Sequence, residues 1–288
     1  NMIFLCKSNI QPKSYCLNFV VEMKSMIKSL KILLSITVLT LSADYSNAQI
    51  YQPFKGVPFD RLMEKEGLYY FNDKPYTGKS LDRYENKKRK QILTWENGIL
   101  HGKRTSYYKD GKTKDIFFFD NGDRTDSFFI YDNLGTLRQK GYYKNNVLNG
   151  VYTRFYSSGK PYIVSTYDDG NLNGVLTHYF NNGQKESEAM MTNNKKNGTF
   201  KAWYEEGTQR KIAEFKDGRR TGETIEFYPN GDTAMVENIK NSMRHGIYKI
   251  WDATLGVMIK SENYKNGKKD GLSLTFDQFG DTLLIEHF

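Results

Sequence analysis

Four histidines are the side chains best suited to chemistry, and their spacing decides what they could do. A histidine can move protons or bind a metal ion when another ligand or a carboxylate is held beside it. His101 and His245 each stand directly before a position of a repeated glycine column, while His178 and His287 are isolated. Because no pair has the spacing of metal ligands, the sequence predicts no metal site and no catalytic histidine.

Carboxylates and nucleophile motifs are no better candidates for catalysis. Glu205-Glu206 and Asp168-Asp169 could supply an acid and a base, but both pairs fall in predicted turns, where water solvates them. The sequence lacks a Gly-x-Ser-x-Gly elbow, a His-Glu-x-x-His motif and a phosphate-binding glycine loop. We therefore expect a protein without catalytic residues or a cofactor.

The elements that carry these side chains repeat every 24 residues. Self-similarity at a fixed period of this length is typical of repeat architectures. One column starts each unit and is glycine at all but one place: Gly78, Gly102, Asp126, Gly150, Gly174, Gly198, Gly222 and Gly246, with Gly271 one residue late. Two large apolar columns keep the same register and serve as predicted anchors. One contains Tyr107, Tyr131, Phe155, Tyr179, Trp203, Phe227 and Trp251, and the other contains Trp95, Phe119, Tyr143, Tyr167, Met191, Phe215 and Ile239.

Two turns divide each unit into two strands. One turn ends on a glycine such as Gly111 or Gly159, and the other reads Asn-Gly or Asp-Gly, as at Asn97-Gly98 and Asp217-Gly218. Such pairs suit turns that need positive φ. Strands joined by so few residues must be antiparallel. The sequence therefore predicts an all-β fold, an extended twisted antiparallel β-meander of about 8.5 repeats with two strands per repeat, over residues 76–288.

The pattern Gly198-Thr-Phe-Lys-Ala-Trp203-Tyr204-Glu-Glu-Gly207, followed by Phe215-Lys-Asp-Gly218-Arg-Arg-Thr-Gly222, resembles MORN repeats in their variant bacterial form. The resemblance implies an extended, twisted β-meander with scaffold roles, protein contacts, dimerisation and phospholipid contact. It also implies an antitoxin-like role, since relatives of the variant are often labelled antitoxins. The chain departs from the pattern where a glycine is replaced, at Asp126, Asn146, Asn194 and Ser242.

The segment before the repeats predicts export. Residues 23–48 combine three lysines, an apolar run from Ile32 to Leu41 and a small-residue exit, the three parts of a signal peptide that would be cleaved before Gln49. The alternative, a membrane anchor, is disfavoured because the apolar run has 10 residues and a bilayer-spanning helix needs about 20. Residues 1–22 read as a non-native upstream extension, and 49–75 as a cap or linker.

The positions of the cysteines and the distribution of charge exclude further classes of protein. Cys6 and Cys16 both precede the apolar run. We therefore expect that the mature chain after the predicted cleavage site forms no internal disulfide and lacks the cysteine that a bacterial lipoprotein signal places at that site. Residues 1–48 contain five lysines and two acidic residues, which leaves 37 basic against 31 acidic side chains spread along the rest. A nucleic-acid protein would concentrate its charge on one face. We expect no nucleic-acid partner.

A second aromatic column offers the predicted binding surface. Its residues follow the first anchor directly, so in a strand they would project from the opposite face. It becomes Asp132, Asp252 and Asp277 in three units, which suits a solvated face. We predict that Tyr108, Tyr156, Tyr204 and Tyr228 contact a partner, whereas simple packing between strands is the alternative. The glycines Gly102, Gly150, Gly174, Gly198, Gly222 and Gly246 and the anchors Tyr107, Phe155, Trp203, Phe227 and Trp251 are predicted to be structural.

These features favour an exported, non-enzymatic scaffold, periplasmic or at the cell surface, that binds a protein partner along a sheet face or edge. The first alternative is a cell-envelope or carbohydrate-binding module that uses the aromatic rows, with a glycan or lipid as ligand. The second alternative is an antitoxin-like binding protein, which requires that residues 23–48 are not a signal.

Overall fold

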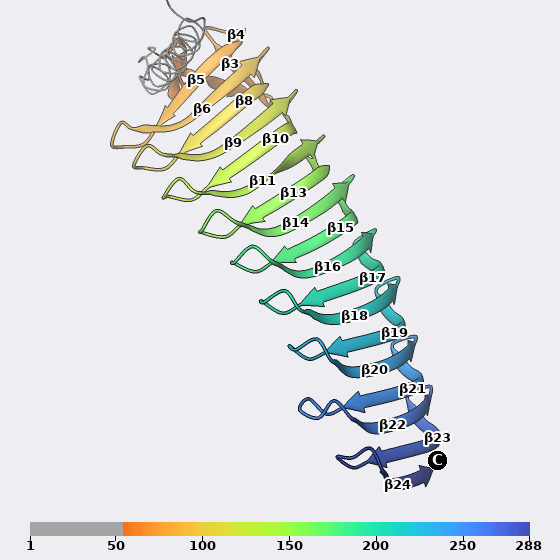
Figure 1. Ribbon diagram of the computed structural model, residues 1–288. Coiled ribbons are helices and arrows are strands. Elements are labelled where there is room, and N and C mark those ends of the chain that lie inside the picture. Colours follow the sequence, from red (N-terminus) through yellow and green to blue (C-terminus); the bar gives the residue numbers. More distant parts are fainter. Residues whose placement is uncertain (1–53) are drawn as a thin grey trace, which may run out of the picture. The chain divides into compact units, whose positions relative to one another are not determined.

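The computed structural model describes residues 54–288, and residues 55–288 form one unit. The predicted upstream extension and signal peptide lie outside the described residues. Strand follows antiparallel strand in chain order, forming a long, twisted and open sheet (Figure 1). The predicted all-β meander is therefore confirmed.

The strands of the meander come in hairpins that repeat along the chain. Before them lie β1 (Val57–Pro58), the 3-10 helix η1 (Phe59–Arg61) and a small sheet of β2 (Met63–Lys65), β3 (Leu68–Phe71) and β4 (Lys74–Pro75). The meander consists of β5 (Gly78–Arg83), β6 (Arg89–Glu96), β7 (Ile99–Leu100), β8 (Gly102–Tyr107), β9 (Thr113–Asp120), β10 (Asp123–Tyr131), β11 (Leu137–Lys144), β12 (Val147–Leu148), β13 (Gly150–Phe155), β14 (Pro161–Asp168), β15 (Asn171–Tyr179), β16 (Lys185–Thr192), β17 (Lys195–Trp203), β18 (Gln209–Lys216), β19 (Arg219–Phe227), β20 (Thr233–Lys240), β21 (Met243–Trp251), β22 (Met258–Lys265), β23 (Lys268–Phe276) and β24 (Thr282–His287).

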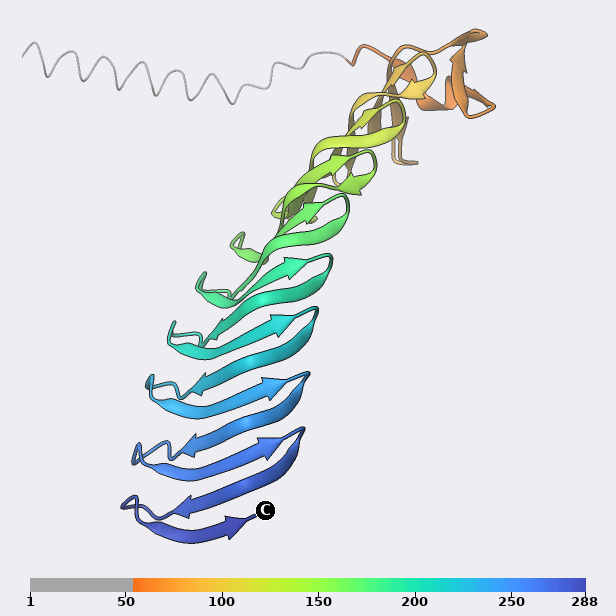
Figure 2. The ribbon, with the colours of Figure 1, turned by 90° about the vertical axis from the view of Figure 1, so that its right-hand side faces the viewer.

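Two kinds of turn form the two long edges of this sheet. Two-residue turns with both residues at positive φ, such as Asn97 (50°) and Gly98 (82°), form one edge, which we call the glycine-turn edge. These are the turns whose twist matches that of the strands they join. Longer turns that begin at Tyr108 or its equivalents form the other, the tyrosine-turn edge. Figure 2 shows both edges and the twist of the sheet between them.

The repeat glycines lie near irregularities in the strand pairing. Their φ values are positive: Gly102 79°, Gly150 81°, Gly174 112°, Gly198 108°, Gly222 67° and Gly246 102°. In the hairpin of β16 and β17, for example, the register shifts between Ala189 and Met191. A bulge of this kind bends a strand and increases its twist. The column therefore marks the places where the sheet curves.

Backbone hydrogen bonds connect successive turns along the glycine-turn edge. The N–H of each second turn residue donates to a carbonyl of the preceding hairpin, as in Gly122 to Leu100 (2.8 Å) and Gly218 to Lys196 (2.8 Å). Where glycine is missing, Asn194 still adopts φ 65° and donates to Leu172 (3.1 Å). The turns thus form a continuous ladder even at the departures from the repeat pattern.

Replacing Ser242 by glycine is expected to raise the free energy of unfolding by about 0.5–1 kcal/mol, because serine holds an unfavourable left-handed conformation there (φ 67°). Asn194→Gly is the matched comparison and should lower it by about 1 kcal/mol. The Asn194 side chain accepts a bond from the Leu172 N–H (2.8 Å) and donates to Asn171 (2.7 Å). Urea unfolding of both variants measures the two free energies of unfolding, which should change in opposite directions.

A single sheet buries its core by pairing a large side chain with a small one across neighbouring strands. On one face, which we call the packed face, Phe128 is opposite Gly141, Leu176 opposite Ala189 and Phe200 opposite Ala213. Ala189 and Ala213, the small partners, are 3% and 0% exposed. The anchors Tyr107, Phe155, Trp203, Phe227 and Trp251 are only half-buried.

Aromatic residues before the first repeat pack against it. The Tyr69 ring lies 4.4 Å from that of Trp95, and Phe59 lies 6.3 Å from the same indole. The Tyr69 N–H donates to the Gly98 carbonyl (2.9 Å), and β1 pairs with β5 in parallel. The side of Trp95 that would face a preceding repeat is thereby covered. Within residues 54–288 we find no helix with the length and apolar character needed to cross a bilayer.

Candidate partner-binding surfaces

The predicted binding tyrosines connect neighbouring repeats. Each lies just after a strand, at the start of a turn, and its hydroxyl donates to the backbone carbonyl 23 residues further on, over 2.6–2.8 Å. The pairs are Tyr108 to Tyr131, Tyr156 to Tyr179, Tyr204 to Phe227 and Tyr228 to Trp251, and Tyr84 adds a bond to Tyr107. The rings are half-buried between successive turns. We call this row the tyrosine ladder.

Units without the tyrosine hold the turn by other bonds. Asp132 accepts the N–H groups of Leu134 (3.0 Å) and Thr136 (2.9 Å), which closes its own turn. Arg138 contacts Asp132 and donates to the Phe155 carbonyl (3.3 Å), which is where a tyrosine hydroxyl would bond. The aspartates are therefore turn-closing residues, and this explains them better than a solvated face does.

Burial and backbone bonds shift the pKa values along this edge. Two N–H donors, Leu255 and Thr254, lower the pKa of Asp252 despite some opposing burial. Burial raises the pKa of Tyr108, with Asp132 adding repulsion, and burial also raises that of Tyr156. The raised pKa values favour the neutral, hydrogen-bond-donating form of Tyr108 and Tyr156. Their binding of a partner remains a prediction, and it could involve only the ring surface that the ladder leaves exposed.

Removing one ladder hydroxyl, as in Tyr204→Phe, is expected to lower the free energy of unfolding by about 1 kcal/mol, since the carbonyl loses its donor and the ring stays. The converse variant is Phe180→Tyr, because phenylalanine occupies the same column there. It should add a donor for the Trp203 carbonyl and raise stability. Thermal unfolding of the pair measures both; equal midpoints for Tyr204→Phe and the unaltered chain would contradict the ladder's contribution.

The ladder also predicts a loss of stability in alkali. Since Tyr108 and Tyr156 have raised pKa values in the folded chain, their contribution is complete below the ordinary tyrosine pKa of about 10. It is lost as the pH rises through the raised folded pKa, where the hydroxyls lose the proton they donate. Unfolding midpoints between pH 8 and 11.5 should fall more steeply in the unaltered chain than in Tyr108→Phe/Tyr156→Phe.

The structure places the histidines apart from one another. His101 lies between Glu96 (3.3 Å) and Asp120 (3.4 Å), and His245 Nδ1 accepts the Asn266 N–H at 3.5 Å. Among residues 54–288, no group of three or more His, Cys, Asp or Glu side chains is placed to hold a metal ion. His178 packs near the Tyr162 ring at 6.1 Å.

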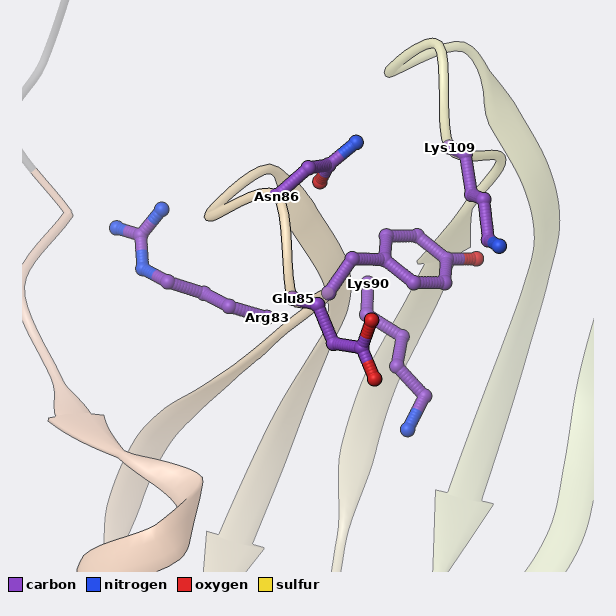
Figure 3. Close-up of a pocket in the computed structure, with 6 residues that line it drawn as sticks. Arg83, Glu85, Asn86, Lys90 and Lys109 are labelled. Atoms are coloured by element: carbon purple, nitrogen blue, oxygen red, sulfur yellow. The ribbon is translucent and has the colours of Figure 1, made fainter.

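A basic hollow of about 350 Å³ opens beside the first tyrosine turn. We call it the basic turn pocket; it is lined by Arg83, Tyr84, Glu85, Asn86, Lys90 and Lys109. Lys109 reaches in from the neighbouring turn, while Arg83 extends to the other side (Figure 3). Lys90 is paired with Asp82 (3.0 Å), whereas Lys109 makes no ion pair with any residue in 54–288. With Lys87 and Lys88 close in sequence, the pocket suits an acidic group.

A row of cations and glutamates follows the packed face through the later repeats. Glu237, whose side chain is 5% exposed, bridges Arg220 (2.7 Å) and Arg244 (3.0 Å). Glu262 contacts Lys269 at 2.9 Å and accepts the Tyr264 hydroxyl at 2.8 Å. Although burial opposes it, these contacts lower the pKa of Glu262. We call these residues, together with Lys196, the charged row.

Sequence reasoning missed this charged row, although a signal was present. The column 15 residues after each repeat start changes from Leu93 and Phe117 to Glu237 along the chain, and Glu262 follows in the same column, shifted by the one-residue insertion. Residues 22 after the start are basic in several consecutive units, as in Arg220. Two charged columns of opposite sign, on strands that pair, would have predicted the bridges.

An open sheet of repeated hairpins with connected turns defines a β-repeat protein, and its sequence agrees with a known repeat family. The family described as MORN repeat variant matches residues 100–121 and 148–169. These two segments therefore match repeats of this variant type. Such repeats are generally linked to interactions with proteins or membrane lipids.

No curated protein matches this chain in sequence. The solved structure described as "Crystal Structure of TcdB2-TccC3" aligns with 75% of this chain and 16% of its own chain, at 12% identity and a TM-score of 0.16. The aligned region spans about a sixth of that protein's length.

Proposed function

We propose that the protein is an exported, non-enzymatic scaffold that binds a protein partner along its repeat array. The observation that most supports this proposal is that the polar side chains form their bonds between neighbouring repeats. Tyrosine hydroxyls, turn asparagines and the glutamates of the charged row bond to neighbouring repeats. They stabilise a long open surface rather than converge on one reacting centre, which is what a scaffold requires.

The basic turn pocket is the proposed contact for an acidic part of that partner. At the first two tyrosine turns it combines the dense basic run Lys87–Lys90 with Lys109, which makes no ion pair within the described part of the chain. The basic residues that line the pocket outnumber its one carboxylate, Glu85. An excess of positive charge favours encounter with an acidic group and makes binding sensitive to salt. A protein partner is favoured over a glycan because the ladder tyrosines already use their hydroxyls within the chain.

A photo-crosslinking amino acid at Asn86, on the rim of the pocket, tests the interaction in cells that produce the protein. We expect one defined protein adduct that is lost in Lys87→Glu/Lys109→Glu. The control Lys216→Glu/Lys240→Glu makes the same charge change on exposed residues of the glycine-turn edge and should leave the adduct intact. Adducts with envelope glycan alone would support the carbohydrate-binding alternative, and adducts insensitive to both variants would contradict the proposed contact.

Export is tested separately by fractionation and N-terminal sequencing. The predicted signal peptide implies that the mature chain begins at Gln49 and is recovered outside the cytoplasm. A chain that retains residues 23–48 in the cytoplasm would contradict export and favour the antitoxin-like alternative.

A further inference from the structure

Lys196 occupies a distinctive place in the charged row. It lies on β17 near the glycine-turn edge, and it is the equivalent, 24 residues earlier, of Arg220. Arg220, Arg244 and Lys269 all contact a buried glutamate of the row. Lys196 forms no ion pair with any residue the structure describes, although it is half-buried. Its environment resembles that of its neighbours except for the carboxylate.

The repeat shows why that carboxylate is absent. Arg220 reaches Glu237, and the residue 24 positions before Glu237 is Ala213. Arg244 and Lys269 instead reach back to a glutamate on the preceding strand, and the matching residue for Lys196 is Ala189. Both alanines are almost fully buried. Lys196 therefore has an alanine at each of the two positions where its equivalents find a glutamate.

Aromatic contacts do not take the place of the carboxylate. The Lys196 ammonium lies 4.3 Å from the ring centre of Phe200 and 5.0 Å from that of Phe215. Arg244 lies over two rings as well, at 3.9 Å and 5.3 Å, and still binds Glu237. Burial lowers the pKa of Lys196, and the Lys211 ammonium adds to this. A partly desolvated cation without a counter-ion favours binding of an anion.

We propose that Lys196 binds a carboxylate group of an acidic peptide segment that lies on the packed face at β17 and β18. The carboxylate would approach the half-buried Lys196 ammonium from solvent, and Phe200 and Phe215, whose ring centres lie 4.3 Å and 5.0 Å from that ammonium, would flank the ion pair. The class of ligand follows from the molecule itself, since the same row already binds two carboxylates of its own chain. This inference rests on the proposed function and names the chemistry of the partner.

The test measures binding of a blocked penta-glutamate peptide, with free glutarate as a second probe, by NMR of lysine-labelled full-length protein. We expect the peptide to shift the Lys196 side-chain signals and to raise the pKa of that ammonium. Lys196→Met should weaken peptide binding about tenfold or more. Lys195→Met is the matched control, because Lys195 is the adjacent, exposed lysine, and its affinity should stay within about twofold of the unaltered chain.

A second pair of variants supplies the carboxylate within the chain. Phe200→Thr with Ala213→Glu reproduces the neighbouring Thr224–Glu237 pair and should abolish peptide binding. Phe200→Thr with Ala213→Gln should still bind the peptide, more weakly than the unaltered chain because the Phe200 ring beside Lys196 is gone. Equal affinity of Lys196→Met and the unaltered chain, or no binding of either probe at millimolar concentration, would overturn the inference. Binding of glutarate as tight as that of the peptide would also overturn it in favour of a small dicarboxylate. None of these results affects crosslinking at Asn86, which tests the proposed function independently.

Discussion

Replacing Phe128 by alanine is expected to lower the free energy of unfolding by about 3–5 kcal/mol, the range for a buried phenylalanine. The side chain is 3% exposed. Its ring stacks on Phe117 at 5.4 Å and lies 4.9 Å from Tyr143 and 6.2 Å from Tyr152. Gly141, its cross-strand partner, has no side chain that could fill the cavity.

Phe129→Ala is the matched control, because Phe129 is the next residue of β10 and is only half-buried. Its loss should be about half as large, since less apolar area leaves water. Urea unfolding followed by tryptophan fluorescence and circular dichroism measures both. Similar losses in the two variants would contradict the view that one face of the sheet holds the core.

Replacing Glu237 by alanine should lower the free energy of unfolding by about 2–3 kcal/mol. Breaking a buried ion pair leaves its partners uncompensated and costs about 3–5 kcal/mol. Here the partners Arg220 and Arg244 have side chains 35% and 38% exposed, so water partly compensates them and the loss is smaller.

Glu226→Ala provides the comparison within the same pair of strands. Glu226 is 41% exposed and, among residues 54–288, forms one ion pair, with Lys211 at 2.7 Å. Exposed pairs of this kind contribute about 0–1 kcal/mol. Unfolding of the two variants at low and at high salt separates them further, because screening should affect Glu226 more. A loss for Glu226→Ala as large as that for Glu237→Ala would contradict the importance of burial in the charged row.

The fold could be predicted because its turns require backbone conformations that only a few residue types adopt readily. Asn97-Gly98 and its equivalents need positive φ at both residues, and few residue types accept that conformation. The spacing of such pairs gives the strand lengths, and short turns permit only antiparallel pairing. The same reasoning holds at Ser242, where the ladder of turns imposes φ 67° on a residue that does not favour it.

The contacts that the side chains make between hairpins could not be predicted in the same way. The spacing of Tyr108 and Tyr156 shows that they share a column, but a hydroxyl bond to a carbonyl 23 residues away depends on how far the turns overlap. Likewise, Ala213 appears unremarkable in sequence, and its burial depends on Phe200 across the strand pair. Local residue type determines the hairpins, whereas the contacts between hairpins depend on twist and register.

The two ladders also determine how such a chain could lengthen during evolution. The tyrosine bonds span 23 residues, and most turn bonds of the glycine-turn edge span 22, so each link joins one unit to the next and reaches no further. A duplicated stretch of 24 residues would carry its own donors and acceptors and would leave the older links unchanged. The extra residue between Asp252 and Val257 lies in a turn that still closes, with the Asp252 N–H bonded to the Val257 carbonyl at 2.9 Å. Surface area for partners can thus grow by gene duplication one two-stranded unit at a time, and the packing of the older units stays as it is.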